Sequence, residues 1–299
     1  MRVFITGATG FIGTAVIPEL LAAGHQVLGL ARNDAAVDVL TGLGVEAHRG
    51  ELADLDSLAA GARACDGVIH LGYHHDFLNF AVGVEIDRLA VGTLVAALEG
   101  TGKPIVIASG TLMLAFGRSP SDPNALGSET DPTPPGSPRG ESETAVLSAA
   151  DRGVRGAVVR LSPSVHDLQR QGLVTQMIAW AREKGVSAYL GEGANVWPAV
   201  HRLDAARLFV LAVEGAKPGS RLHAVAEEGI ALRAIAEAIG EALGVPARGV
   251  SAEEAPSYFP GLALFMGLHN PTSSALTREW LGWSPREVGL LDDIRAIRG

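Results

Sequence analysis

The sequence has little cysteine, a minority of basic side chains and no long apolar segment. Its one cysteine, Cys65, excludes an internal disulfide and is typical of a reducing compartment. There are 24 lysines and arginines against 33 aspartates and glutamates, without a basic stripe, so we expect no nucleic acid as a partner. The longest uncharged segment, residues 255–277, is interrupted by prolines and glycines and predicts no membrane span.

The chain does contain enough hydrophobic sequence for a large core. Of its 299 residues, 47% are hydrophobic, which suits one large α/β domain or a core with a smaller cap. The sequence opens directly on a strand pattern, so we expect no signal peptide and a cytoplasmic location.

Three glycines, Gly7, Gly10 and Gly13, recur at every third residue near the start of the chain. An apolar strand pattern precedes them, and an amphipathic helix pattern over residues 11–23 and a second strand pattern over 26–30 follow. Glycines let a backbone approach phosphates closely, and the N-terminus of a helix stabilises their charge. A plain tight turn is the alternative, but the complete strand–helix–strand context favours a dinucleotide site.

Strand patterns alternate with helix patterns through the first half of the chain. We predict strands at residues 2–6, 26–30, 45–49, 67–71, 104–108 and 154–160. We predict helices at residues 11–23, 34–43, 55–64, 85–100 and 139–151. Such alternation indicates an α/β protein whose parallel sheet is covered by helices on both faces.

The alternation becomes irregular after Leu161. Helix patterns at residues 171–184, 202–214, 231–243 and 273–281 are interrupted by glycine and proline. We therefore divide the chain into a nucleotide-binding domain, residues 1–165, and a smaller substrate-binding subdomain, residues 166–299. Some of the later segments are expected to return to the sheet.

Four further motifs accompany the glycine run: GVIHLG at 67–72, PIVIASGTLMLAFG at 104–117, VHRLD at 200–204 and LGWSP at 281–285. Together they resemble the short-chain dehydrogenase/reductase superfamily, in its extended, epimerase-like branch. The resemblance implies a doubly wound parallel Rossmann sheet, a smaller C-terminal substrate-binding subdomain and an NAD(P) cofactor. It implies cofactor contacts from Gly7, Thr9, Gly10, Phe11, Ile12, Gly13, Glu51, Leu52, Leu71, Gly72 and Pro163.

The end of the second strand bears on the choice of cofactor. An acidic residue there would bind the ribose 2′-hydroxyl of NAD, but this chain has Arg32. The planar guanidinium can donate two bonds to a 2′-phosphate, which favours NADP(H) and leaves NAD possible. The alternative is a solvated arginine that begins the next loop.

The superfamily's catalytic pair, Tyr-x-x-x-Lys, is absent. Arg139 stands at the tyrosine position and Glu143 at the lysine position, and no tyrosine of this chain is followed by lysine four residues later. Arginine stays protonated at ordinary pH, so Arg139 cannot donate a proton. Glu143 can accept bonds from the ribose hydroxyls of the cofactor, or it can pair with Arg139 along the helix. The mechanism of the superfamily therefore does not carry over.

Two other places offer catalytic side chains. Thr111 aligns with the superfamily's catalytic Ser/Thr, where it would bond a substrate carbonyl or satisfy nearby backbone. The run Tyr73-His74-His75-Asp76 follows the fourth strand, at the edge where parallel sheets bind ligands. We predict that any proton transfer comes from this loop, and among its members we favour His75, paired with Thr111 as the carbonyl anchor, over Tyr73; the alternative is a polar surface loop. Consecutive side chains seldom converge on one ion, so we expect no metal.

These features favour an NADP(H)-dependent oxidoreductase that acts on a small, largely apolar carbonyl or alcohol. Two alternatives stay open: an epimerase or dehydratase that retains its cofactor, and a non-catalytic NADP(H)-binding protein that senses redox state. In relatives, the helices that correspond to residues 85–100 and 139–151 pair across a two-fold axis, so the resemblance implies a homodimer. The expected partners are a small-molecule substrate and a second copy of the chain, without nucleic acid or membrane.

Overall fold

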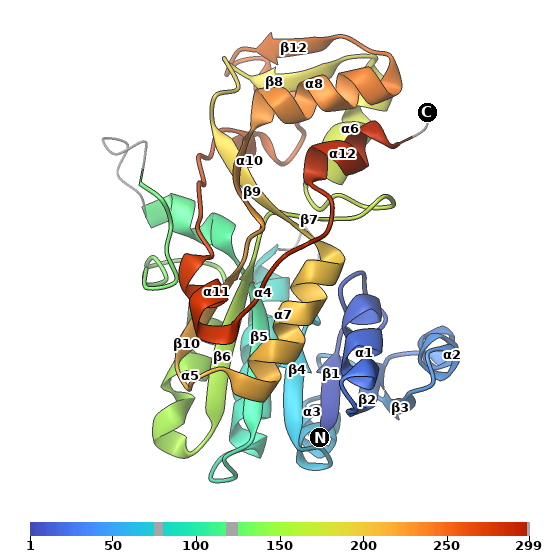
Figure 1. Ribbon diagram of the computed structural model, residues 1–299, viewed down its shortest axis with the longest axis vertical. Helices are drawn as coiled ribbons and strands as arrows, with labels where there is room; N and C mark the ends of the chain where they lie inside the picture. The colour runs from blue at the N-terminus through green and yellow to red at the C-terminus, as the bar shows by residue number, and fades with distance from the viewer. Residues whose placement is uncertain (75–79, 118–124, 298–299) are drawn as a thin grey trace.

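The computed structural model describes residues 1–74, 80–117 and 125–297. Its largest element is a seven-stranded sheet (Figure 1), made of β1 Arg2–Thr6, β2 Gln26–Ala31, β3 Glu46–Arg49, β4 Gly67–His70, β5 Pro104–Gly110, β6 Arg155–Leu161 and β10 Ser220–Ala224. The strands lie in the order β10-β6-β5-β4-β1-β2-β3, and every neighbouring pair is parallel.

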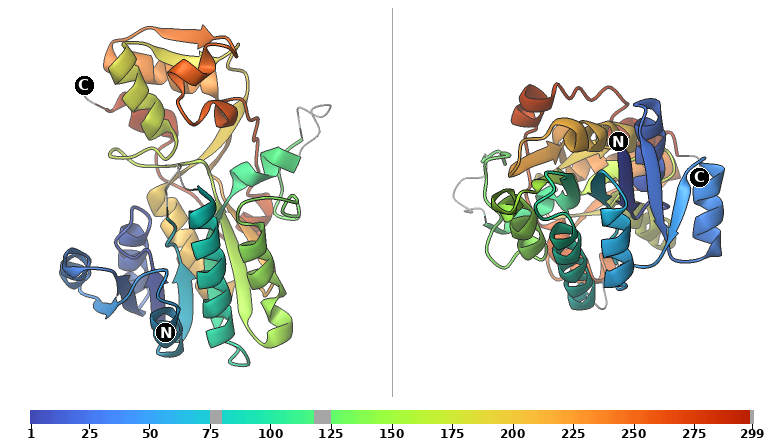
Figure 2. Two further views of the ribbon diagram at one scale, coloured as in Figure 1. Left: turned by 180° about the vertical axis from the view of Figure 1, so that it is seen from behind. Right: turned by 90° about the horizontal axis from the view of Figure 1, so that it is seen from below.

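Helices cover both faces of this sheet, as Figures 1 and 2 show. One face carries α1 Gly13–Ala22 and α7 Arg202–Gly215, the other carries α3 Leu55–Arg63, α4 Phe80–Ala97 and α5 Gly140–Leu147, and α2 Asp34–Gly42 packs against β2 and β3. In β1, Val3 and Ile5 join the core on the α1 side, whereas Phe4 joins the core on the α3 side. This alternation along the buried residues of β1 confirms the predicted doubly wound sheet.

A smaller lobe lies beyond the carboxyl ends of the strands (Figure 1). Its elements are β7 Ser164–His166, β8 Ser187–Leu190, β9 Val196–His201, β11 Glu227–Ala231, β12 Ala247–Val250, α6 Val174–Lys184, α8 Leu232–Leu243, α9 Ala255–Tyr258, α10 Ala263–Met266 and α12 Leu290–Arg295. The lobe has its own core, which includes Trp197 and Phe259. Between its segments the chain returns to the large sheet as α7, β10 and α11 Ala275–Leu281.

The predicted helices are present and differ mainly at their ends, whereas the short helices α9, α10 and α12 were not predicted. Helix α4 begins at Phe80 rather than at residue 85. The helix predicted over 139–151 is α5 followed by a 3₁₀ helix, Ser148–Arg152, which stops at Gly153 with a φ of 69°, a conformation that favours glycine. Within the part of the chain that the structure describes, no helix has both the length and the apolar character needed to cross a membrane.

Candidate functional site

The glycine run forms a cradle at the carboxyl end of β1. Gly7 has a φ of 67° and lies so close to the next loop that a Cβ would come within 2.6 Å of Gly72 N. A Cβ at Gly13, the first residue of α1, would lie 2.3 Å from Gly7 O. Gly10 differs, because it is exposed and its Cβ would meet only Gly7 O, at 3.1 Å. Its missing side chain therefore leaves room for a ligand, which fits a pyrophosphate at the N-terminus of α1.

A cavity of about 1080 Å³ begins at this cradle and extends to the smaller lobe. It is lined by every predicted cofactor-binding residue except Glu143, namely Gly7, Thr9, Gly10, Phe11, Ile12, Gly13, Arg32, Glu51, Leu52, Leu71, Gly72 and Pro163. Its far wall comes from α4, α6 and the loop before α10, through Ile86, Thr175, Gln176, Trp180, Pro260, Gly261 and Leu262. The fold thus gathers distant segments around one space large enough for a dinucleotide and a small second molecule.

Arg32 stands on the cavity wall directly after β2, where its side chain is exposed. The chain turns there because Asn33 caps α2, its Oδ1 accepting a bond from Ala36 N at 2.9 Å. Across the described residues, Arg32 forms no ion pair, so no carboxylate among them neutralises its charge. Glu51 lines the same cavity and brings an acceptor to it.

Sequence reasoning missed Arg170, which also lines the cavity. Its guanidinium carbon lies 5.7 Å from the centroid of the Phe11 ring, and that of Arg202 lies 5.0 Å from the same centroid. Asp167 orients both residues, because it accepts from the backbone N of Arg170 at 3.0 Å and from Nε of Arg202 at 3.0 Å. Two cations therefore stand beside the glycine cradle, and no local pattern places residue 170 next to residue 11.

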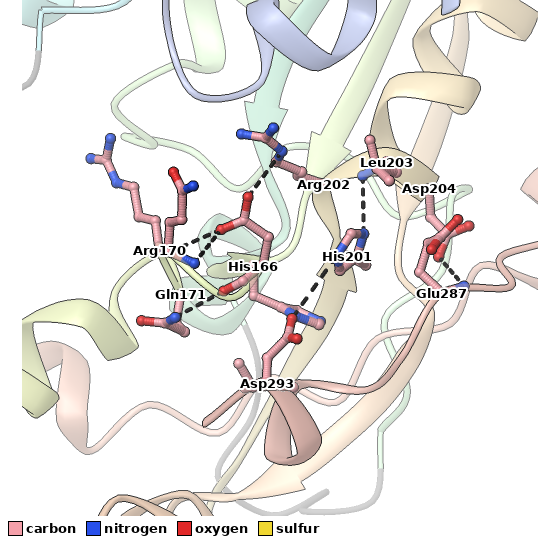
Figure 3. A network of polar contacts seen from close by, with 12 residues as sticks. His166, Arg170, Gln171, His201, Arg202, Leu203, Asp204, Glu287 and Asp293 are labelled. Atoms are coloured by element: carbon pink, nitrogen blue, oxygen red, sulfur yellow. Dashed lines mark hydrogen bonds and ion pairs between the residues drawn. The ribbon is translucent and has the colours of Figure 1, made fainter. Parts of the chain in front are cut away.

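Two histidines, His166 and His201, lie near Asp293 of the C-terminal helix α12 (Figure 3). His166 Nδ1 donates to Asp293 Oδ2 of α12 at 2.6 Å. Burial lowers the pKa of His166, although the Asp293 carboxylate acts in the opposite direction. His201 Nδ1 accepts from Leu203 N at 3.2 Å and so caps the start of α7. Both histidines are buried and have structural partners.

Arg139 does not pair with Glu143, which corrects the interpretation of these residues as a pair along one helix. Its Nη2 donates to Asp87 of α4 at 2.6 Å. Its guanidinium carbon lies 4.9 Å from the centroid of the Tyr73 ring. Burial raises the pKa of Asp87, but the bond from His70 and the charge of Arg139 outweigh it and lower that pKa to about 2. The tyrosine position of the superfamily is therefore filled by a fixed cation.

Glu143 lies in a second buried ion pair and not on the cavity wall. Arg160 of β6 donates to it from Nε at 3.1 Å and from Nη2 at 2.8 Å, and the Thr133 hydroxyl donates as well. Burial raises the pKa of Glu143, but the bonds and charge of Arg160 outweigh burial and lower it. Both carboxylate oxygens are engaged and the side chain has no exposed surface. This geometry corrects the predicted contact between Glu143 and the cofactor ribose.

The predicted catalytic residues have different positions. Tyr73 and His74 line the cavity, whereas His75 lies outside the described residues. Thr111 is fully buried after β5, accepts a bond from Asn270 Nδ2 at 3.1 Å and is absent from the cavity wall. Its predicted bond to a substrate carbonyl therefore has no support from this geometry. In the described ranges, no three His, Cys, Asp or Glu side chains are grouped to hold a metal ion.

A doubly wound parallel sheet with a glycine cradle at its ligand edge defines the class of nucleotide-binding α/β proteins. The chain belongs to the NAD dependent epimerase/dehydratase family, whose model matches residues 3–224. The resemblance to the extended short-chain dehydrogenases is thereby confirmed.

Relatives and solved structures show the same kinship. Uncharacterised proteins of Schizosaccharomyces pombe and Saccharomyces cerevisiae are 43% and 44% identical over 295 and 300 residues, covering 98% and 99% of this chain and 98% of each relative. A 2-alkyl-3-oxoalkanoate reductase of Stenotrophomonas maltophilia is 26% identical over 228 residues, covering 74% of this chain and 67% of the reductase. The structure of a dTDP-glucose 4,6-dehydratase from Streptomyces venezuelae, solved with NAD, matches with a TM-score of 0.78 and 20% identity, covering 99% of this chain and 96% of the dehydratase. At that identity the match shows a shared fold.

Proposed function

We propose that this protein is an NADP(H)-dependent oxidoreductase that acts on a small, largely apolar carbonyl or alcohol. One observation carries the proposal: a single cavity joins Arg32 and the glycine cradle to an apolar wall. That wall includes Ile86 of α4, Trp180 of α6 and Leu262 before α10. Burial against such side chains favours an apolar substrate, because it removes apolar surface from water.

The residues of the cavity fit the cofactor in separate places. When bound, NADP(H) supplies or accepts a hydride at its nicotinamide ring. Gly10 and the N-terminus of α1 would hold the pyrophosphate, and Arg170 would add positive charge beside it. Arg32 would bind the 2′-phosphate, and Pro163 lies after β6, where the resemblance expects the nicotinamide. The smaller lobe then excludes water from the reacting atoms.

The charges of the cavity wall favour a small substrate over a nucleotide sugar. A nucleotide sugar carries a diphosphate of its own, which would need further cations. In the described part of the chain, Arg32 and Arg170 are the arginines that line the cavity, and no lysine lines it. Arg170 lies against Phe11 and hence beside the cradle assigned to the cofactor.

A second candidate is a non-catalytic NADP(H)-binding protein that senses redox state. It is favoured by the side chains at the two positions of the superfamily's catalytic pair. Arg139 is bound to Asp87, and Glu143 is bound to Arg160, so neither is available for proton transfer. The same observation disfavours an epimerase or dehydratase, whose chemistry relies on a tyrosine where this chain has Arg139.

The test begins with the purified full chain, freed of bound nucleotide. Calorimetric titration should show tighter binding of NADPH than of NADH. A panel of aldehydes and ketones should then show turnover of small apolar carbonyls, followed through the absorbance of the reduced nicotinamide. Conversion of UDP-glucose or dTDP-glucose without net change of the cofactor would overturn the proposal in favour of an epimerase or dehydratase. NADPH binding without turnover of any compound would overturn it in favour of the sensor.

A further inference from the structure

Given the oxidoreductase function proposed above, on which the following depends, we propose that Tyr73 donates the proton to the substrate oxygen and that Arg139 positions it electrostatically. Arg139 would then supply the positive charge that lysine provides in the usual pair. The usual pair lies on one helix, whereas here the cation stands at the N-cap of α5 and the phenol on the β4–α4 connection.

Tyr73 occupies a position suited to this role. It lies three residues after β4, which neighbours β1 in the sheet, so it stands where the strand order reverses and α/β proteins bind their ligands. Its side chain lines the cavity together with Gly10 and Gly72 of the cofactor site. A Cβ built on Gly83 of α4 would lie 3.7 Å from the Tyr73 hydroxyl and 2.6 Å from His74 O. The absence of a side chain at Gly83 thus lets this loop approach α4 closely.

Arg139 is fixed over the Tyr73 ring by a buried carboxylate. Its guanidinium carbon lies 4.9 Å from the ring centroid, within the range of a cation–π contact. Asp87 accepts from Arg139 Nη2 at 2.6 Å and from Nε at 3.3 Å, so the guanidinium is held at two points. Ser142 Oγ donates to Asp87 Oδ2, the oxygen that also accepts from Arg139 Nε, at 2.6 Å. The Arg139 side chain is 15% exposed, so solvent screens its charge only in part.

The same carboxylate also fixes the backbone beside Tyr73. His70 Nε2 lies 3.3 Å from Asp87 Oδ1, and His70 Nδ1 lies 2.8 Å from the Thr6 hydroxyl. That hydroxyl accepts a bond from Gly72 N at 3.1 Å. These bonds connect β1, β4 and α4 to the residue that precedes Tyr73. The ring and the cation above it are therefore both positioned through Asp87.

The charges around Tyr73 suit proton donation in the direction of carbonyl reduction. Burial raises the pKa of Tyr73, Arg139 lowers it and Asp87 raises it. The phenol is consequently protonated near neutral pH and can act as an acid. Alcohol oxidation would need the phenolate, so its rate should rise as the pH increases toward the pKa of Tyr73. Arg139 limits how far burial raises that pKa.

The reaction balances with the groups named. The carbonyl carbon forms a C–H bond with the hydride from the reduced nicotinamide, and the C=O π electrons move onto oxygen. That oxygen forms an O–H bond with the proton of the Tyr73 hydroxyl. The phenolate left on Tyr73 regains a proton from water, and the cofactor leaves in its oxidised form.

The first arm of the test measures tyrosine ionisation and needs neither substrate nor cofactor. The chain has three tyrosines, so difference spectra between wild type and Tyr73→Phe assign the ultraviolet transition of Tyr73. Arg139→Met should raise the pKa of Tyr73 by about one pH unit, because a neighbouring positive charge is lost. Arg139→Lys keeps a charge that can pair with Asp87, should stay folded, and should give a smaller rise. An unchanged pKa in both variants would overturn the role of Arg139.

The second arm measures turnover of the best carbonyl from the panel. Tyr73→Phe should lower kcat by about 10²- to 10⁴-fold with NADPH affinity unchanged. Tyr258→Phe is the matched control, because Arg248 stacks on the Tyr258 ring at 5.2 Å but Tyr258 does not line the cavity. Full turnover in Tyr73→Phe, or loss only in His75→Ala, would overturn Tyr73 as the donor while the oxidoreductase function stands. If the wild-type protein turns over no carbonyl, both the proposed oxidoreductase function and the role of Tyr73 as proton donor are overturned.

Discussion

Arg32 is one residue whose charge bears on cofactor choice, because it lines the cavity and forms no ion pair among the described residues. Arg32→Ala should weaken NADPH binding by about 1–3 kcal/mol and leave NADH binding nearly unchanged, since only NADPH carries the 2′-phosphate. Calorimetric titration of both cofactors measures the difference. Arg49→Ala is the control, because Arg49 is paired with Asp34 and does not line the cavity. An equal loss for both cofactors would contradict the assignment of Arg32.

Gly10 is the second residue with a specific consequence, because its open side faces the cavity. Gly10→Val should abolish cofactor binding while the chain stays folded, since the new methyl groups would stand where the pyrophosphate approaches. Circular dichroism and calorimetry together check this. Gly92→Ala in α4 is the control, because a Cβ there meets nothing within 4 Å. A folded Gly10→Val variant that binds cofactor normally would show that the site assignment is wrong.

At the scale of elements, the buried pair of Glu143 and Arg160 fastens α5 to β6. Glu143→Gln should lower the free energy of unfolding by about 3–5 kcal/mol, because it leaves the Arg160 charge buried without its partner. Urea unfolding measures this loss. Glu141→Gln, on an exposed side chain of the same helix, should change stability little.

Replacing both Glu143 and Arg160 separates the effect of an unpaired charge on stability from the effect of lost packing. The double variant Glu143→Leu/Arg160→Met should regain most of the stability lost by Glu143→Gln, because no unpaired charge remains buried. Cofactor affinity should be unchanged in every stable variant, since Glu143 does not line the cavity. A selective loss of cofactor binding in Glu143→Gln would instead restore the predicted ribose contact.

At the scale of the whole molecule, stability should fall as the pH drops from about 6.5 to 4. Burial lowers the pKa of His223 to about 4, although the Glu129 carboxylate opposes this, and His166 shifts in the same direction. The unfolded chain therefore takes up protons below about pH 6.5 that the folded chain does not accept, which favours unfolding. For His223 the effect is on the order of 3 kcal/mol.

Urea unfolding at several pH values between 4 and 7 measures this slope. His223 Nδ1 donates to Ser273 O at 2.8 Å, so His223→Asn keeps a donor and removes the titrating ring. The variant should flatten the pH dependence. The lowered pKa of Asp87, about 2, places its contribution at more acidic pH. A wild-type stability that is constant over this range would contradict the prediction.

Assembly is also a property of the whole molecule, and the homodimer stays a prediction. Helices α4 and α5 pack side by side, and α4 presents Val82 and Leu89 to solvent, 53% and 40% exposed. Light scattering at micromolar concentration should give the mass of a dimer. Leu89→Glu should give monomers, whereas Leu264→Glu, on the other lobe and 70% exposed in the wild type, should not. A monomeric wild type would contradict the resemblance on this point.

The sequence by itself was sufficient for the features that depend on local patterns. The strands and helices of the first half follow from apolar periodicity, and the glycine cradle follows from spacing that a helix N-terminus requires. Apart from Arg32, which its place after the second strand indicated, the cavity-lining residues assigned to the cofactor were predicted through the resemblance to the extended short-chain dehydrogenases.

Only the tertiary structure decided how the charged side chains pair. Arg139 could bond Glu143 four residues away along the helix, yet it bonds Asp87 on α4, 52 residues earlier in the chain. Arg170 likewise reaches Phe11 across the two lobes. Buried charges bind whichever partners the packed elements bring within bonding distance, and this proximity arises when the sheet and lobes assemble. The spacing of residues along the sequence does not indicate which charged side chains become neighbours, so the network around Tyr73 could be identified only from the tertiary structure.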